Sequence, residues 1–112
     1  MAVVNQYRFH GKTTTAAETA TLLAPSINET FIIRSLRVTN KSGSNTPTVT
    51  ITNNAFEIVH TQSLSASASV EILTLPLILE GDTLLKYTTA GTVSDWVVFG
   101  ISYLNILKEK VD

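Results

Sequence analysis

The 112-residue sequence contains no cysteine, few glycines and prolines, and no long hydrophobic run. Without thiols the chain cannot form a disulfide framework, a zinc ribbon or a cysteine nucleophile, so its core has to hold by packing alone. The longest apolar stretch, residues 96–107, is interrupted by Gly100, Ser102 and Asn105 and is shorter than the roughly 20 residues that a spanning helix needs. We therefore expect no membrane span.

Charged residues are also scarce. Lys, Arg, Asp and Glu make up 15% of the chain, and the formal net charge is −1. The eight Lys and Arg residues are scattered and form no stripe that could neutralise several phosphates, so we expect no nucleic-acid partner. The first residues lack the basic start and long apolar segment of a signal peptide, which predicts synthesis in a cytoplasm.

The sequence offers no arrangement of residues typical of catalysis or cofactor binding. His10 and His60 have no further ligand at metal-binding spacing, and Glu80 and Asp82 fit a polar turn better than a calcium loop. No serine occupies a Gly-x-Ser-x-Gly elbow, and the five glycines stand singly, which leaves no glycine-rich phosphate loop. We therefore expect no enzyme activity, no metal site and no cofactor.

What the sequence does contain is threonine, serine, valine and isoleucine in short alternating segments, a composition that favours pleated sheet. Residues 29–40 and 48–52 alternate between apolar and polar positions, and residues 41–47 concentrate turn formers between them. In the first of these strands the alternation assigns Ile32, Leu36 and Val38 to one face. Further strands are expected at residues 3–9, 56–60, 70–75, 83–89 and 93–107. Residues 77–82 carry an apolar run into a turn, and residues 13–23 permit a strand or a short helix.

Seven or eight short strands separated by turns predict an all-β fold, an antiparallel β-sandwich of jelly-roll type. We expect a single domain over residues 1–112, with an N-terminal arm at about residues 1–12 and a short C-terminal tail at about residues 108–112.

The last predicted strand is apolar on both faces. Val98, Leu104 and Ile106 alternate with Phe99 and its apolar neighbours, whereas a two-layer sandwich buries only one face of each strand. The surplus face predicts a contact between subunits and therefore a symmetric oligomer. The expected interface residues are apolar side chains of this strand and of the N-terminal segment: Trp96, Val98, Phe99, Ile101, Tyr103, Leu104, Val3, Tyr7 and Phe9.

Trp96 and Tyr103 also raise the alternative of a carbohydrate-binding module, because jelly rolls serve as lectins. Trp96 alternates in register with Val98, however, and this pattern favours packing over an exposed aromatic platform for sugars.

Residues 15–107 resemble small β-sandwich virion proteins of tailed bacteriophages. The resemblance lies in an early Ile-x-Ser-Leu-x-Val-x-Asn strand, a Thr/Val strand and a Gly-Asp turn before the closing hairpin. The matching residues are Ile33, Ser35, Leu36, Val38, Asn40, Gly81 and Asp82. The sequence departs from an obvious tail-fibre pattern in having no long repetitive shaft.

This resemblance implies a structural protein that is made in the host bacterial cytoplasm and incorporated into the virion. The role it favours is a capsid decoration (cement) protein that binds the major capsid protein, commonly as a homotrimer. A neck, tail or fibre adaptor that binds other virion proteins is the alternative. For either role the N-terminal residues 3–9 could add a strand to the sheet edge of a neighbour.

Overall fold

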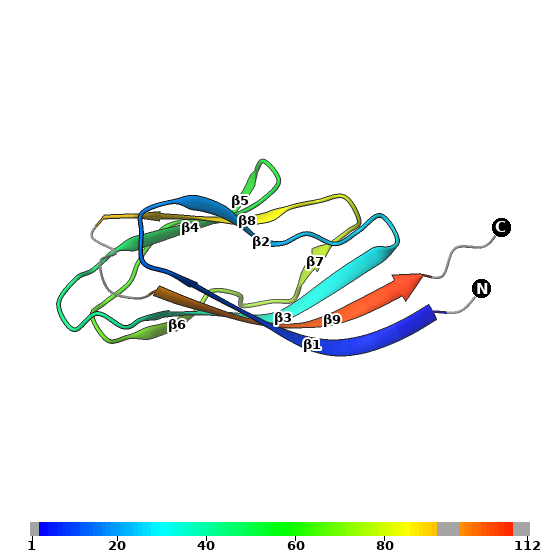
Figure 1. Ribbon diagram of the computed structural model, residues 1–112, viewed down its shortest axis with the longest axis horizontal. Coiled ribbons are helices and arrows are strands. Elements are labelled where there is room, and N and C mark those ends of the chain that lie inside the picture. The colour runs from blue at the N-terminus through cyan, green and yellow to red at the C-terminus, as the bar shows by residue number, and fades with distance from the viewer. Residues whose placement is uncertain (1–2, 92–96, 109–112) are drawn as a thin grey trace.

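The computed structural model describes residues 3–91 and 97–108, and within these residues it contains nine β-strands and no helix (Figure 1). The strands are β1 (Val3–Thr14), β2 (Thr19–Leu23), β3 (Glu29–Asn40), β4 (Thr48–Asn53), β5 (Phe56–Ser63), β6 (Ser69–Glu71), β7 (Leu77–Leu79), β8 (Leu85–Ala90) and β9 (Val97–Lys108). They form two antiparallel sheets packed face to face, which confirms the predicted β-sandwich. In the described part of the chain, no helix of the length and apolarity needed to cross a membrane occurs.

The order of the strands is that of a jelly roll. One sheet has the order β1-β9-β3-β6, with β7 also paired to β3, and the other has the order β2-β8-β4-β5. Because β6 and β7 pair with different parts of β3, they act as one interrupted strand. Counted in this way, the first strand pairs with the last, the second with the second-last and so on inward, which describes a long hairpin rolled into two sheets.

A β-bulge in β3 decides which of its side chains enter the core. The alternation of the sequence alone assigns Ile32 to the face of Leu36 and Val38, and this assignment is wrong. The pairing of β3 with β9 shifts between Ile33 and Ser35, which inserts one residue and reverses the alternation. Ile33 therefore lies in the core with Leu36 and Val38, and Ile32 faces outward.

The carboxylate of Glu71 supports this bulge from the neighbouring strand β6. It accepts hydrogen bonds from the Ser35 hydroxyl group and, at 2.8 Å, from the Leu36 backbone N–H. These bonds satisfy polar groups that the irregular pairing leaves without a regular ladder partner.

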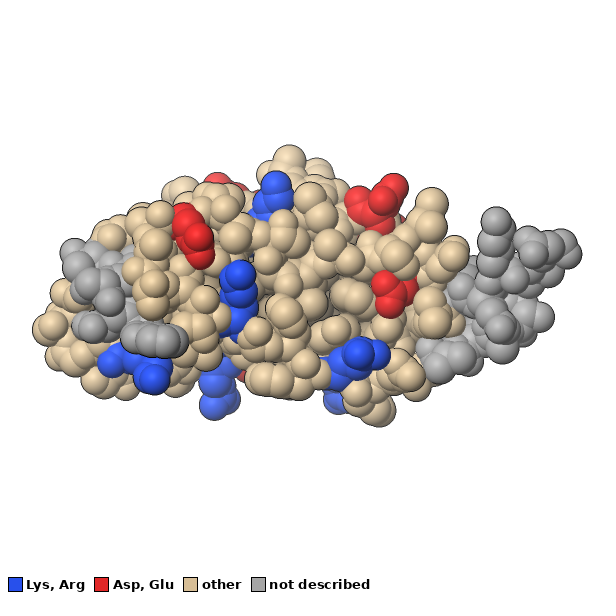
Figure 2. Space-filling model, in the orientation of Figure 1, with Lys and Arg blue, Asp and Glu red and all other residues tan. Residues whose placement is uncertain are grey.

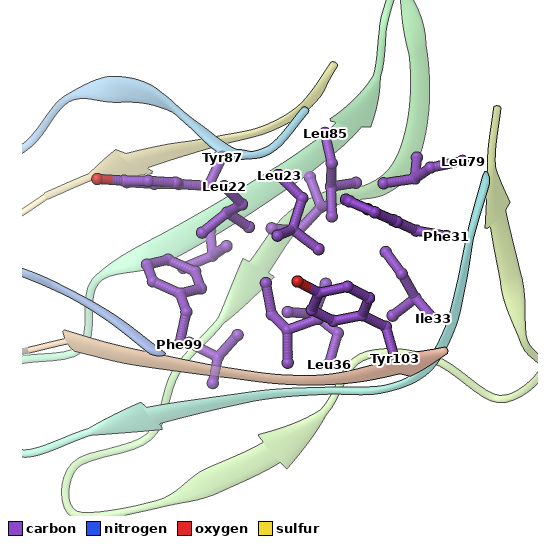
Figure 3. Packing of buried hydrophobic residues seen from close by; sticks show 14 of the residues in the cluster. Leu22, Leu23, Phe31, Ile33, Leu36, Leu79, Leu85, Tyr87, Phe99 and Tyr103 are labelled. Carbon is purple, nitrogen blue, oxygen red and sulfur yellow. The ribbon is translucent and has the colours of Figure 1, made fainter. Parts of the chain in front are cut away.

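The core between the sheets is built from large apolar side chains of both layers (Figure 3). Tyr87 of β8 packs on Phe99 of β9 with ring centres 4.5 Å apart, and Phe31 of β3 packs on Tyr103 with ring centres 4.7 Å apart. Tilted aromatic pairs of this kind contribute about 0.5–1.5 kcal/mol beyond the burial of their area. Val49 and Ile51 of β4 are fully buried, as their alternation predicts.

The hydroxyl group of Tyr87 reaches the edge of the core and donates a hydrogen bond of 2.6 Å to Glu18. Thr14 donates a second bond of 2.6 Å to the same carboxylate oxygen. The hydrogen bonds from Thr14 and Tyr87 lower the pKa of Glu18, while burial, together with the adjacent carboxylate, raises the pKa of Tyr87 to about 12. This cluster ties the connection between β1 and β2 to the sheet of β8.

The N-terminal segment is a strand of the domain itself. Residues 3–12, expected to form an arm, pair with β9 along their whole length, from Val3 opposite Lys108 to Lys12 opposite Phe99. This pairing covers the edge of β9, which would otherwise expose a row of backbone hydrogen-bonding groups. Residues 13–23 complete β1 and form β2, so they contain no helix. Of the expected tail, Lys108 ends β9, and residues 109–112 lie outside the described residues.

Candidate interaction surface

The outer face of the five-stranded sheet carries an apolar row that runs from one edge of the sheet to the other. Tyr7 of β1 pairs with Leu104 of β9, Leu104 pairs with Ile32 of β3, and Ile32 pairs with Ile78 of β7. Tyr7 is 75% exposed and Ile78 is 55% exposed, whereas Leu104 and Ile32 between them are half-buried. We call these four residues the apolar row.

Phe9 extends the apolar row along β1. It is 70% exposed and its ring lies against Gly100 of β9, where an added Cβ atom would be 3.4 Å from two ring carbons. The missing side chain at Gly100 therefore leaves room for the ring on the surface of the sheet. The ring forms one wall of a hollow of about 310 Å³ that is otherwise lined by Ser35, Arg37, Thr39, Val98, Gly100 and Ser102.

Two arginines lie near the β1 end of the apolar row. The guanidinium carbon of Arg34 lies 5.9 Å from the centre of the Tyr7 ring, within the range of a cation–π contact. Tyr7, Arg8, Phe9 and Arg34 line a shared hollow of about 450 Å³, and none of its described lining residues is a carboxylate. We call these four residues the basic end.

The opposite end of the row lies beside the turn between β4 and β5. Phe56, which begins β5 and is 77% exposed, lies at this end together with Ile78. The two side chains line a hollow of about 330 Å³ together with Asn53, Asn54, Glu80 and Thr83. The Asn53 side-chain oxygen Oδ1 is buried and accepts no hydrogen bond from the described residues. We call Asn53, Phe56, Ile78 and Glu80 the acidic hollow.

Two carboxylates of the five-stranded sheet, those of Glu29 and Glu71, accept hydrogen bonds from other parts of the chain. Glu29 accepts hydrogen bonds from the Ser26 backbone N–H and from the Asn105 side-chain amide, and the bond from Ser26 contributes most to lowering its pKa. Burial raises the pKa of Glu71, but its hydrogen bonds, led by the one from Ser35, outweigh burial and bring it below the ordinary value. Both carboxylates therefore accept hydrogen bonds that connect neighbouring segments of the sheet.

The residues predicted from the sequence to form an interface fall into an outward-facing set and a buried set. Tyr7, Phe9, Val98 and Leu104 lie together on the outer face of the five-stranded sheet. Three others belong to the core of the chain, where they cannot contact a partner, and this part of the prediction has to be corrected: Phe99, Ile101 and Tyr103. Their positions alternate with those of Val98 and Leu104, so a strand directs the two sets to opposite faces. Trp96 and the side chain of Val3 lie outside the described residues.

Four surface residues of this site were not predicted from the sequence: Ile32, Ile78, Phe56 and Arg34. Ile32 was missed because the bulge in β3 is not visible in the alternation pattern. Ile78 lies in a run of apolar residues that gives no face assignment. Phe56 follows the Asn53-Asn54 turn after one residue, and the apolar pattern of its strand gave no sign that its side chain is exposed.

Histidine and carboxylate side chains are the possible metal ligands of this chain. Among the described residues, no three His, Asp or Glu side chains gather closely enough to hold a metal ion. His60 forms an exposed pair with Glu57 at 2.8 Å, and His10 lies in β1 opposite Ile101. The surface features in this part of the chain are thus apolar, aromatic and charged groups suited to contact with another protein.

No family model and no curated protein matches the sequence. Several solved structures align with the chain, among them the following three. The nucleoplasmin-like N-terminal domain of Drosophila FKBP39 has 18% identity, a TM-score of 0.48, and coverage of 95% of this chain and 93% of that one. A chain of the cyanophage Pam1 capsid asymmetric unit has 14% identity, a TM-score of 0.49, and coverage of 93% and 85%. A chain of infectious bursal disease virus, Gx strain, has 14% identity, a TM-score of 0.47, and coverage of 95% and 32%. At these values the similarities identify neither a family nor a function.

Proposed function

We propose that this chain is a non-enzymatic structural protein of a bacteriophage particle, a jelly-roll subunit that forms an oligomer and binds other virion proteins. Within this class we favour a capsid decoration protein that forms a homotrimer and binds the major capsid protein. The observation that carries the proposal is the apolar row, which extends an exposed apolar surface across an entire sheet of an otherwise well-packed domain.

The composition of this surface supports a protein partner. Large contiguous apolar patches on soluble domains mark interaction sites, because water contact with them is unfavourable. Tyr7, Phe9 and Arg34 are of the residue types that are enriched in protein–protein interfaces and that contribute most of their binding energy. They stand on β-strands of the sheet, and a rigid surface loses little conformational entropy on binding.

The proposal is tested by the association state of the purified chain and by its binding to virus particles. Light scattering at micromolar concentration is expected to give a mass above that of the monomer, and the chain is expected to sediment with capsids of the virus that encodes it. The double variant Tyr7→Ser, Phe9→Ser is expected to remain folded, by circular dichroism, and to lose at least tenfold in both kinds of association. Lys86→Ser, on the outer face of the other sheet, is the matched control and is expected to behave as the unmodified chain.

A monomer that also fails to sediment with capsids would contradict the proposal. Imaging of the particle separates the two virion roles: density on the capsid surface supports the decoration protein, and density at the neck or tail supports the adaptor.

A further inference from the structure

The two ends of the apolar row carry opposite charge, and from this we infer that the basic end of one copy docks into the acidic hollow of the next copy. Subunits of the proposed oligomer would thus meet head to tail, each using two different surfaces. The inference rests on the proposed function only in taking the chain to be a homo-oligomer.

On one face of the molecule, most positive and negative side chains lie in different regions. In Figure 2 most Lys and Arg lie along the lower part of the face shown, on the side of β1 and β9, while most Asp and Glu lie in its upper half. At the basic end, Arg34 lies over the exposed Tyr7 ring, and Arg8 lines the same hollow. At the acidic hollow, Glu80 is a lining residue, and exposed Asp82 follows it in the same turn. Complementary fields of this kind favour and orient association.

The hydrogen-bonding groups of the two surfaces are complementary as well. The basic end provides donors, namely the Arg34 guanidinium group and the Tyr7 hydroxyl. The acidic hollow provides an acceptor, the Glu80 carboxylate. A hydrogen bond between a guanidinium group and a carboxylate is charge-assisted and therefore stronger than a neutral one.

The apolar groups fit the same arrangement. Phe56 and Ile78 form an apolar wall of the hollow, and an aromatic ring from the basic end would cover both. A central aromatic anchor surrounded by charged groups is the usual composition of an energetically important contact.

The placement of the two surfaces makes the contact intermolecular. β1 is one edge of the five-stranded sheet, whereas β7 lies beyond β3 on the other side of that sheet, and β5 is an edge strand of the second sheet. One copy therefore cannot bring its own basic end to its own hollow. Contacts between two different surfaces repeat around an axis and close into a ring when the rotation per subunit permits, which is compatible with a trimer.

The test uses two double variants of the full chain. Tyr7→Ser, Arg34→Ser removes the basic end, and Phe56→Ser, Glu80→Ser removes the hollow. All four side chains are exposed, so both variants are expected to fold. Each variant alone is expected to be monomeric at concentrations where the unmodified chain is an oligomer, with a dissociation constant raised at least tenfold. Lys86→Ser is again the control for removal of a charge.

Mixing the two variants is the decisive step. An equimolar mixture is expected to form a one-to-one dimer and nothing larger, because each variant retains one of the two complementary surfaces. A contact between two identical basic ends would instead leave the hollow variant associated like the unmodified chain, and this result would overturn the inference. So would a mixture that remains monomeric.

The outcomes separate this inference from the proposed function. If the unmodified chain is a monomer at every concentration but sediments with capsids, the head-to-tail contact is refuted and the virion role stands. If head-to-tail assembly occurs without any binding to virus particles, the contact stands and the virion role is refuted.

Discussion

At the scale of single residues, the backbone adopts the left-handed conformation at four described non-glycine positions: Asn54, Thr61, Ser67 and Asp82. Asn and Asp tolerate this conformation because their short side chains bond to the nearby backbone. Thr61, with a φ of 52°, is different, because a β-branched side chain is crowded there. It lies in β5 where the pairing with β4 is irregular, and its N–H donates to the Thr50 hydroxyl at 3.0 Å.

We predict that Thr61→Asn stabilises the protein. Asn adopts the left-handed conformation at lower cost and keeps the backbone N–H that bonds to Thr50, so the free energy of unfolding should rise by about 1 kcal/mol. Urea unfolding followed by circular dichroism measures the change. Thr61→Val, which keeps the branched shape, is the control and should give no gain. An unchanged or lower stability of Thr61→Asn would argue against strain at this position.

At the scale of elements, β3 is the strand that holds the five-stranded sheet together, since it pairs with β9 on one side and with both β6 and β7 on the other. Its bulge turns Ile32 outward into the apolar row and is supported by Glu71. β1 is the exposed edge of this sheet, and its inward positions carry Arg8 and Lys12. Charged side chains at such positions discourage unspecific pairing of edge strands, which leaves the outer face as the surface for specific contacts.

We predict that Glu71→Ala lowers the free energy of unfolding by about 1–2 kcal/mol, because the Ser35 hydroxyl and the partly buried Leu36 N–H lose their acceptor. Glu57→Ala is the matched control. Glu57 is half exposed and forms an ion pair with exposed His60, so its removal should change stability by less than about 0.5 kcal/mol. Equal effects of the two substitutions in urea unfolding would contradict the role given to Glu71.

At the scale of the whole molecule, three carboxylates connect separate parts of the sandwich. Glu18 links the β1–β2 connection to β8, Glu29 links the start of β3 to β9, and Glu71 links β6 to the bulge of β3. Each of them has a pKa below its ordinary value of 4.5 in the folded chain. The fold therefore depends on their ionised forms.

We predict that stability is lost on acidification. A group whose pKa is lower in the folded than in the unfolded chain contributes stability above its unfolded pKa and loses it as the pH falls through the folded value. The free energy of unfolding should thus be nearly constant from neutral pH down to about pH 5 and fall at lower pH. Urea unfolding at several pH values from 7 to 3 measures this profile. The triple variant Glu18→Gln, Glu29→Gln, Glu71→Gln should show a flatter one, and an equally steep profile would contradict the prediction.

Much of the fold could be predicted because local pattern and turn chemistry agree along the chain. The strand at residues 29–40 and the loop at residues 41–47 were located at the observed boundaries, and Val49 and Ile51 are buried as their alternation indicates. For the candidate surface, Tyr7, Phe9, Val98 and Leu104 were identified from the surplus of apolar residues. These features depend on the period of two in a strand, which a sequence displays directly.

The amino-acid sequence by itself determined that the chain is an all-β sandwich with more apolar surface than one core can bury. Only the tertiary structure decided where that surplus lies. The bulge that turns Ile32 outward, the pairing that aligns Tyr7, Leu104, Ile32 and Ile78, and the meeting of Ile78 with Phe56 join segments far apart in the sequence. Such contacts follow from strand order and register, and these are decided by the packing of the whole chain, which no local pattern contains.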